Sequence, residues 1–261
     1  MADDRPWPGQ LDGPLLDGRT ALITGAGSVN GIGRATARLF ARHGARVAVS
    51  DIDADGAQAV ADEIGPGHLG LTCDVTDRES CEHATNAALS AFGSVDILIN
   101  NVGFTKGTRI MDVEGAEFDL LHAINVRSMM FMSQAAIPSM RRRRSGTIVC
   151  LASVAGQRGG GLYGSSHYAA SKAGVIGLGK ALARELAADG IRVNIVSPSL
   201  IKTDGSPGDS EEVRGRFEKD VPMVRSGTVW EVAGAILFAA SDLSGYMTGA
   251  TIDVNGGFYM R

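Results

Sequence analysis

The chain has 261 residues, 44% of them hydrophobic and 21% charged, with a formal net charge of -4 at pH 7. This length can bury one substantial core, and the composition is that of an ordinary globular protein. The mild acidity gives no broad electrostatic reason to bind nucleic acid or anionic lipid, so we expect neither a nucleic-acid nor a membrane partner.

The first segment, residues 1–17, is rich in Pro, Gly and Asp and has no apolar core of the signal-peptide kind. We expect a flexible N-terminal arm over 1–17, followed by a single domain over 18–261.

Short apolar runs alternate with Ala-rich helical stretches along the rest of the chain. Strands are expected at Thr20–Thr24, Arg46–Asp51, Gly70–Cys73, Asp96–Asn100, Gly146–Leu151, Arg192–Ser197 and Thr251–Val254. Helices are expected at about 31–43, 54–64, 77–92, 115–140, 166–189 and 229–241. This alternation predicts an α/β fold: a Rossmann-type, doubly wound domain with a seven-stranded, mostly parallel sheet and helices on both faces.

One segment, about 199–224, interrupts the alternation with Gly, Ser, Pro and charged residues. It follows a strand and therefore starts at the carboxyl edge of the sheet, where ligands bind in open α/β folds. We expect it to act as a lid over a substrate rather than as a plain surface insertion.

A glycine-rich loop, Thr24–Gly33, follows the first strand and opens the first helix. Glycines here permit a tight turn and a close approach to a pyrophosphate, which rests on the helix N-terminus. The strand before the loop and the helix after it supply the context that the motif needs. The expected cofactor contacts in this loop are Gly25, Ser28, Asn30, Gly31, Ile32 and Gly33.

Asp51 ends the second strand, twenty residues after Gly31. A carboxylate at this spacing accepts hydrogen bonds from the adenosine ribose and repels a 2′-phosphate. Neither Ile52 beside it nor the loop residues Ala26–Ser28 offer a basic group for such a phosphate. The sequence therefore favours NAD over NADP as the cofactor.

Tyr168 and Lys172 are spaced i, i+4 at the start of a long predicted helix and share one face of it. A free Tyr has a pKa of about 10, and a nearby ammonium lowers that value. A phenol so tuned can exchange a proton with an alcohol or ketone during hydride transfer. Alone, the pair is a common accident in helices; further signals along the chain make it persuasive.

Taken together with further motifs, these features make the chain resemble the short-chain dehydrogenase/reductase family over about residues 16–257. The matching motifs are Thr24-Gly25 with Gly31-Ile32-Gly33, Asp74-Val75, Asn100–Gly103, Asn125, Ser153, Tyr168 with Lys172, Asn194, and Gly249 to Gly257. As an ordered set they are highly specific.

The resemblance implies a role for each matching residue. Tyr168 would be the general acid/base, while Lys172 would lower its pKa and bind the nicotinamide ribose. Ser153 would hydrogen-bond the substrate oxygen, and Asn125 would hold a water that links Lys172 to solvent. The plainer alternative for Ser153 or Asn125 alone is a helix cap or a structural polar group. Further cofactor contacts would come from Ile52, Asp74, Val75, Asn101, Val102, Gly103, Pro198, Ile201 and Thr203, and Tyr168 would also contact the cofactor. The resemblance also implies a homotetramer or homodimer built on the helices at 115–140 and 166–189.

Departures from the family pattern occur near the ligands. The glycine loop is two residues longer than usual around Ser28–Asn30, and Ser199 follows Pro198 where Gly is common. Asn255 stands where Asp-Gly-Gly is frequent, and the stretch that contains Gly159–Gly161 is slightly long.

Other reactive residue types have plainer interpretations. Cys73, Cys81 and Cys150 lack metal-ligand or C-x-x-C spacing, so we expect buried free thiols and a reducing, cytoplasmic setting. The five histidines are scattered, so we expect no metal site, and we expect His167 at the surface or the pocket rim. The Arg141–Arg144 run is expected to be solvated at a helix C-terminus.

The sequence therefore predicts an NAD-dependent enzyme that transfers hydride reversibly between NAD(H) and a secondary alcohol or ketone. An NADPH-dependent ketoreductase of the 3-oxoacyl-carrier-protein reductase kind is the alternative among enzymes. A non-catalytic NAD-binding regulator is the alternative from another class. The identity of the small-molecule substrate is not encoded in these motifs.

Overall fold

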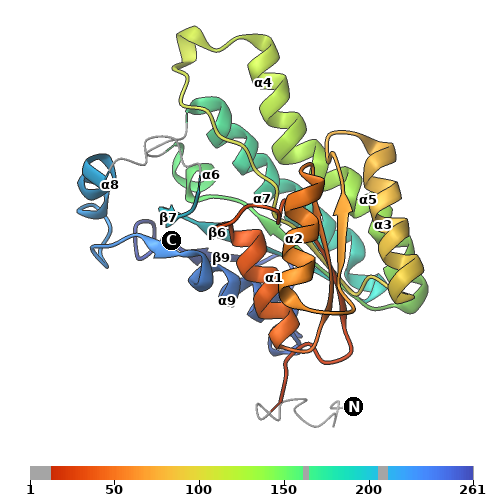
Figure 1. The fold of residues 1–261 in the computed structure, drawn as a ribbon. Helices are drawn as coiled ribbons and strands as arrows, with labels where there is room; N and C mark the ends of the chain where they lie inside the picture. The colour runs from red at the N-terminus through yellow and green to blue at the C-terminus, as the bar shows by residue number, and fades with distance from the viewer. Residues whose placement is uncertain (1–12, 161–164, 205–210, 261) are drawn as a thin grey trace, which may run out of the picture.

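The computed structural model describes residues 13–160, 165–204 and 211–260. The centre of the described chain is a seven-stranded sheet in the order β3-β2-β1-β4-β5-β6-β9, with every neighbouring pair parallel (Figure 1). Its strands are β1 (Thr20–Thr24), β2 (Arg46–Asp51), β3 (Leu69–Thr72), β4 (Ile97–Asn100), β5 (Gly146–Leu151), β6 (Ile191–Pro198) and β9 (Thr251–Val254). The predicted fold class is confirmed, and the strand positions shift only at their ends.

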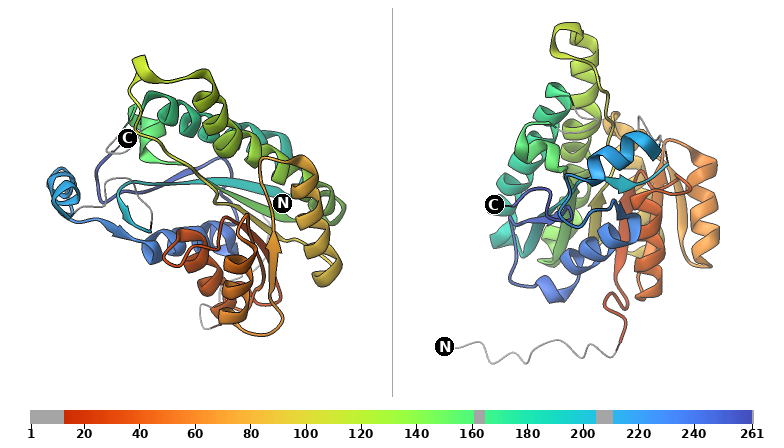
Figure 2. Two further views of the ribbon diagram at one scale, coloured as in Figure 1. Left: turned by 45° about the horizontal axis from the view of Figure 1, so that its top comes forward. Right: turned by 90° about the vertical axis from the view of Figure 1, so that its left-hand side faces the viewer.

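Helices cover both faces of this sheet, as the left-hand view of Figure 2 shows. One apolar core lies between the sheet and α1 (Ile32–Arg42), α2 (Ala54–Ile64) and α9 (Val229–Ala240). A second core lies on the other face, under α3 (Arg78–Phe92), α5 (Ser128–Arg143) and α7 (Ser166–Leu186). Strands between two cores are buried on both sides, which explains the continuous apolar runs of β1 and β4.

Shorter elements complete the described chain. These are α4 (Gly115–His122), α6 (Val154–Arg158), α8 (Glu211–Glu218), the two-stranded pair β7 (Ile201–Lys202) and β8 (Gly227–Thr228), and 3₁₀ turns at Ile110–Asp112, Ala187–Asp189 and Asp242–Ser244. The predicted single helix over 115–140 is wrong in one respect. A π-helical turn over Ala123–Arg127 separates α4 from α5.

The strand order reverses beside β1, which pairs with β2 on one side and β4 on the other. A parallel sheet opens a crevice at the carboxyl ends of its strands where the order reverses. The glycine loop, Asp51, Asn101 and Ser153 all stand at or just after these strand ends. The fold thus gathers the predicted site residues at one edge of the sheet.

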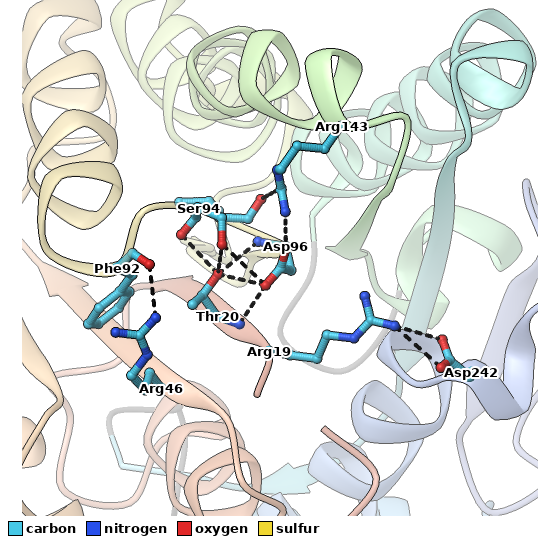
Figure 3. A network of polar contacts seen from close by, with 9 residues as sticks. Arg19, Thr20, Arg46, Phe92, Ser94, Asp96, Arg143 and Asp242 are labelled. Carbon is cyan, nitrogen blue, oxygen red and sulfur yellow. Dashed lines mark hydrogen bonds and ion pairs between the residues drawn. The ribbon is translucent and has the colours of Figure 1, made fainter. Parts of the chain in front are cut away.

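The opposite edge is closed by a polar network centred on Asp96 (Figure 3). The backbone N–H and hydroxyl of Thr20 each donate to Asp96 Oδ2 over 2.8 Å, and Arg143 pairs with the same carboxylate. Burial opposes ionisation, but these hydrogen bonds outweigh it and hold the pKa of Asp96 below its ordinary value. The network joins the starts of β1 and β4 to the end of α5 and so fixes the frame far from the crevice.

The basic run 141–144 belongs largely to this frame. Arg141 Nε bonds Asp189 over 2.6 Å, and Arg144 donates to the carbonyl of Ala188 over 2.8 Å. With Arg143 engaged as well, three of the four guanidinium groups hold the C-terminal end of α5 against neighbouring elements. All four residues are nevertheless exposed, as expected for a basic run at a helix C-terminus.

At the N-terminus, residues 1–12 of the predicted arm lie outside the described residues. Leu16 is buried in the core, and its backbone N–H donates to the carbonyl of His43 over 2.9 Å. The packed domain therefore begins before Gly18. In the described part of the chain, no helix combines the length and apolar character needed to cross a bilayer. Within those same ranges, no three His, Cys, Asp or Glu side chains are grouped to hold a metal ion.

Candidate active site

The glycine loop packs its backbone tightly against the loop after β4. Gly25 has φ +64°, and a Cβ there would meet Val102 Cγ2 at 2.8 Å. A Cβ on Gly33 would stand 2.7 Å from the carbonyl oxygen of Gly25 and 2.7 Å from Asn101 Nδ2. Real Cβ contacts are not this short, so both positions need glycine.

Asn101 fastens this loop in place. Its Nδ2 donates to the carbonyls of Thr24 and Gly25 over 2.9 and 2.8 Å, and its backbone N–H donates to Thr24 Oγ1 over 3.1 Å. The side chain predicted to contact a cofactor therefore also fixes the loop geometry on which cofactor binding depends.

Asp51 is held in a defined orientation at the end of β2. Its Oδ2 accepts from the N–H of Gly27 over 2.8 Å, and its Oδ1 accepts from the N–H of Asp53 over 3.1 Å. Carboxylate oxygens offer more than one acceptor site each, so the group retains capacity for ribose hydroxyls.

A groove of about 470 Å³ runs along this edge of the sheet. Half of the eighteen predicted cofactor contacts line it, namely Gly25, Ser28, Asp51, Ile52, Asp74, Val75, Asn101, Val102 and Gly103. Cys73, Thr76, Leu120 and Ile124 complete the lining. None of these described lining residues is Lys or Arg, and α1 offers its N-terminus beside Gly31 at the loop end. The groove therefore brings half of the predicted cofactor contacts together at one edge of the sheet.

The two extra residues of the glycine loop reach the segment after β7. The N–H of Asn30 donates to Asp204 Oδ2 over 2.7 Å, and the N–H of Asp204 donates back to the carbonyl of Asn30 over 3.3 Å. These two hydrogen bonds hold the loop that carries the predicted cofactor contacts Ser28 and Asn30 against the segment after β7. Residues 205–210 of the expected lid lie outside the described residues.

Pro198, Ile201 and Thr203 stand at the same edge of the sheet. Pro198 ends β6 beside Val254 of β9, and Ile201 packs on the core from β7. The backbone around Ser199 bonds to Val254 and Asn255, with Ser199 Oγ donating to the Asn255 carbonyl over 3.2 Å. The departures at Ser199 and Asn255 therefore contact each other.

Lys172 is buried, with 4% of its surface exposed, and its Nζ donates to the carbonyl of Leu151 over 3.0 Å. Burial lowers the pKa of Lys172 to about 8. Nζ lies 6.0 Å from the centroid of the Tyr168 ring, so the two side chains share one face of α7 as predicted. A Cβ on Gly103 would stand 2.9 Å from Nζ, which explains why a glycine passes here.

Asn125 lies in the π-helical turn between α4 and α5 and is also buried. Its Oδ1 accepts from the N–H of Phe104 over 2.8 Å, and its Nδ2 donates to Ser171 Oγ over 2.9 Å. Ser171 in turn donates to the carbonyl of Tyr168 over 2.8 Å. π-turns are frequent at functional sites, and this one connects the loop after β4 with α7, which carries Tyr168 and Lys172.

Ser153 combines two roles. It is the N-cap of α6, where its hydroxyl accepts from the N–H of Ala155 over 3.2 Å, and its side chain lies close enough to Tyr168 to act on the pKa of that phenol. Burial raises the pKa of Tyr168, although the Ser153 side chain acts to lower it. Lys172 does not lower the pKa of Tyr168 as the resemblance implies. Desolvation has the largest effect on that pKa, and the Lys172 ammonium donates to the Leu151 carbonyl instead.

His167 was not expected here, and the prediction of a surface or rim position is wrong. The residue is 2% exposed, and its Nε2 lies 2.9 Å from Glu117 Oε1. Glu117 Oε2 pairs with Lys106 Nζ over 2.6 Å, while Ser165 Oγ lies 2.6 Å from His167 Nδ1 and donates to the Lys106 carbonyl over 2.8 Å. The network anchors the first turn of α7, and hence Tyr168, to α4. An acidic residue fifty positions away gave no sequence signal for it.

The four predicted catalytic residues are thus brought together by contacts. Ser153 reaches the Tyr168 phenol, Lys172 faces the same ring, and Asn125 connects through Ser171 to the backbone of Tyr168. The three cysteines are buried and free, as expected. Gly161, at the end of the lengthened glycine stretch, lies outside the described residues.

Comparisons with known proteins agree along nearly the whole chain. A family model described as enoyl-(acyl carrier protein) reductase matches residues 25–259. An uncharacterized short-chain type dehydrogenase/reductase of Sinorhizobium fredii is 52% identical over 253 residues, covering 95% of this chain and 100% of that protein. The 3-oxoacyl-[acyl-carrier-protein] reductase of Escherichia coli is 41% identical over 245 residues, covering 94% and 99%. A crystal structure of a short-chain type dehydrogenase/reductase from Mycobacterium marinum matches with a TM-score of 0.90 at 36% identity, covering 96% and 99%.

Proposed function

The chain belongs to the short-chain dehydrogenase/reductase family, and from this premise we propose that it is an NAD-dependent oxidoreductase acting on a secondary alcohol or ketone. The observation that carries the proposal is the convergence of Tyr168, Lys172, Ser153 and Asn125 at the edge of the sheet that also bears the Asp51 groove.

The cofactor contacts follow from this placement. The groove residues from Gly25 to Gly103 would hold the adenosine half, and the N-terminus of α1 at Gly31–Gly33 would face the pyrophosphate. Pro198, Ile201 and Thr203 would contact the nicotinamide half. When bound, NAD(H) supplies the hydride acceptor or donor at the nicotinamide C4.

Asp51 supports NAD as the cofactor. Its carboxylate is oriented by Gly27 and Asp53 and would accept hydrogen bonds from the adenosine ribose. A 2′-phosphate would bring negative charge against this group, and the described residues that line the groove include no Lys or Arg to offset it.

Tyr168 would hold and move the proton. Its raised pKa keeps the phenol protonated at neutral pH, ready to donate to a ketone oxygen. Alcohol oxidation needs the deprotonated form and should therefore be faster at alkaline pH. Ser153 would orient the substrate oxygen, and the Lys172 ammonium would favour the phenolate where it approaches the ring.

Two features around the site complete the proposal. The segment 199–224 would act as the lid over the substrate, since it starts at the carboxyl end of β6. A homotetramer or homodimer would form through the helical segment 115–140, which contains α4 and most of α5, and through the segment 166–189, which contains α7. Sedimentation as a monomer at micromolar concentration would reject that assembly.

A second candidate is an NADPH-dependent 3-oxoacyl-carrier-protein reductase, which the 41% identity to the Escherichia coli enzyme favours. Asp51 argues against NADPH. A basic docking surface for a carrier protein would have to use the exposed 141–144 run, three of whose guanidinium groups also bond within the chain.

The test is a panel of secondary alcohols assayed for NADH formation at alkaline pH, in parallel with NADP⁺. Turnover with NAD⁺ and little with NADP⁺ is expected. Activity with NADP⁺ alone would overturn the cofactor assignment. Tight NADH binding without turnover of any alcohol would favour the non-catalytic regulator.

A further inference from the structure

Arg158 is the last residue of α6, the short helix that Ser153 caps at its other end. Its guanidinium carbon lies 4.2 Å from the centroid of the Phe258 ring, so the cation is stacked on that ring. With a rise of about 1.5 Å per residue, the Cα atoms of Ser153 and Arg158 are on the order of 8 Å apart. A fixed positive charge therefore stands close to the serine that we expect to orient the substrate oxygen.

The turn that carries Phe258 is tied to the edge of the sheet where we expect the nicotinamide. The N–H of Phe258 donates to the carbonyl of Asn255 over 3.0 Å. Ser199, which directly follows the expected cofactor contact Pro198, donates from Oγ to the same carbonyl over 3.2 Å. The aromatic ring that supports the guanidinium thus belongs to the substrate side of the crevice.

The expected lid, segment 199–224, packs against the same C-terminal turn. The N–H of Met223 donates to the carbonyl of Gly256 over 3.1 Å, and a Cβ on Gly256 would meet Val221 Cγ1 at 2.7 Å. Arg158 therefore stands between the capping serine at one end of α6 and the turn on which the lid segment rests.

The end of α6 is held in place without using the charge of Arg158. The neighbouring Gln157 accepts from Ser197 Oγ over 2.8 Å and donates from Nε2 to Asp253 Oδ1 over 2.8 Å. Within the described part of the chain, neither an ion pair nor a hydrogen bond joins the Arg158 guanidinium to a carboxylate. Its donors are therefore available to a ligand, while its position is set by Gln157 and Phe258.

We propose that Arg158 binds a carboxylate of the substrate, so that the enzyme acts on ketones or secondary alcohols that also carry a carboxylate. The guanidinium offers two parallel N–H donors that match the two carboxylate oxygens. A phosphate dianion is less well matched, because α6 and residues 255–260 contain no second Lys or Arg. The inference rests on the proposed function, because it takes the reacting oxygen to lie at Ser153 and Tyr168.

The assay compares oxo acids with their methyl esters. The acids are 3-oxobutanoate, 4-oxopentanoate and 5-oxohexanoate, in which the carboxylate lies progressively further from the ketone, and each ester has the same chain without the charge. NADH oxidation at neutral pH gives kcat/KM for each compound. We expect the acid of best length to exceed its ester by about tenfold to a hundredfold, as one charge-assisted hydrogen-bonded pair allows.

Three variants assign that preference to Arg158. Arg158→Met keeps an unbranched side chain on Phe258 but removes the charge, so the acid-to-ester ratio should fall to about one while the ester rate and NADH affinity stay. Arg158→Lys keeps the charge without the planar donors and should give an intermediate ratio. The control is Arg42→Met at the C-terminal end of α1, which removes an arginine stacked 5.6 Å from the Trp230 centroid and should keep the wild-type ratio.

An acid preference that survives in Arg158→Met would overturn the assignment. Wild-type protein that reduces the esters as well as the acids at every chain length would also overturn it and would leave the proposed function standing. If no acid, no ester and no alcohol of the panel above is turned over, the proposed function fails and this assignment fails with it. The wild-type ratio decides the substrate class even if Arg158→Met folds poorly.

Discussion

Gly33→Ala should damage both the fold and the binding of NADH. A Cβ at this position would stand 2.7 Å from the Gly25 carbonyl oxygen and 2.8 Å from the Cα of Ala26, and neither backbone atom can move independently of the loop. Ala gains about 0.5–1 kcal/mol in a helix interior relative to Gly, but overpacking costs about 1–3 kcal/mol. At mid-range values the clash, about 2 kcal/mol, exceeds the helix gain, about 0.75 kcal/mol, and the net loss of about 1 kcal/mol lowers Tm by a few degrees.

The matched control is Gly234→Ala in α9, where an added Cβ meets nothing within 4 Å. That variant should gain about 0.5–1 kcal/mol from helix propensity alone. Thermal unfolding followed by circular dichroism gives the stabilities, and NADH fluorescence titration gives the affinities. We expect Gly33→Ala to lose at least about tenfold in NADH affinity, since the loop must shift at the α1 N-terminus. If Gly33→Ala matched Gly234→Ala in both measurements, the packing of the glycine loop described above would be wrong.

Three further predictions concern single side chains. Asp51→Ser should lose about 1.5–3 kcal/mol of NADH binding free energy and reduce the preference for NAD⁺ over NADP⁺ in kcat/KM. Substitution of the exposed Asp55 by Ser is the control. An unchanged preference in Asp51→Ser would reject the ribose contact. His167→Phe should lower kcat while NADH affinity stays, because Glu117 then keeps only Lys106 as a partner and the first turn of α7 loses its bond to α4. Unaltered kcat would show that the network does not position the phenol. Burial lowers the pKa of Lys172 from 10.5 to about 8, so the native state releases this proton first and the free energy of unfolding should rise as the pH increases between these values. Urea titrations across that window should show the rise flattened in Lys172→Met, and an identical slope in both proteins would contradict the buried ammonium.

The positions of the strands, the glycine loop and most helices could be predicted from the sequence, because strand ends, glycine loops and helix periodicity are local signals. Asp51 could be placed from its spacing to the glycine loop, and Tyr168 and Lys172 from their i, i+4 relation. The parallel sheet then brings Ser153 to the same edge without any further information.

Contacts between distant segments could not be predicted in this way. The hydrogen bonds between Asn30 and Asp204 and the pairing of Glu117 with buried His167 join residues whose spacing carries no period. The π-turn at Asn125 could not be predicted either, because one extra residue in a helix leaves the apolar pattern over 115–140 nearly unchanged. The direction of the Tyr168 pKa depends on burial, which the Tyr-Lys spacing does not report.

The most direct test of the central proposal compares wild-type protein with Tyr168→Phe. The rate of NADH formation with the best secondary alcohol is measured for both, together with NADH affinity by fluorescence. Loss of the proton-transfer group should reduce turnover by about 10²–10⁴-fold while NADH still binds. Normal turnover by Tyr168→Phe, with the fold and NADH binding intact, would contradict the assignment of this phenol as the general acid/base.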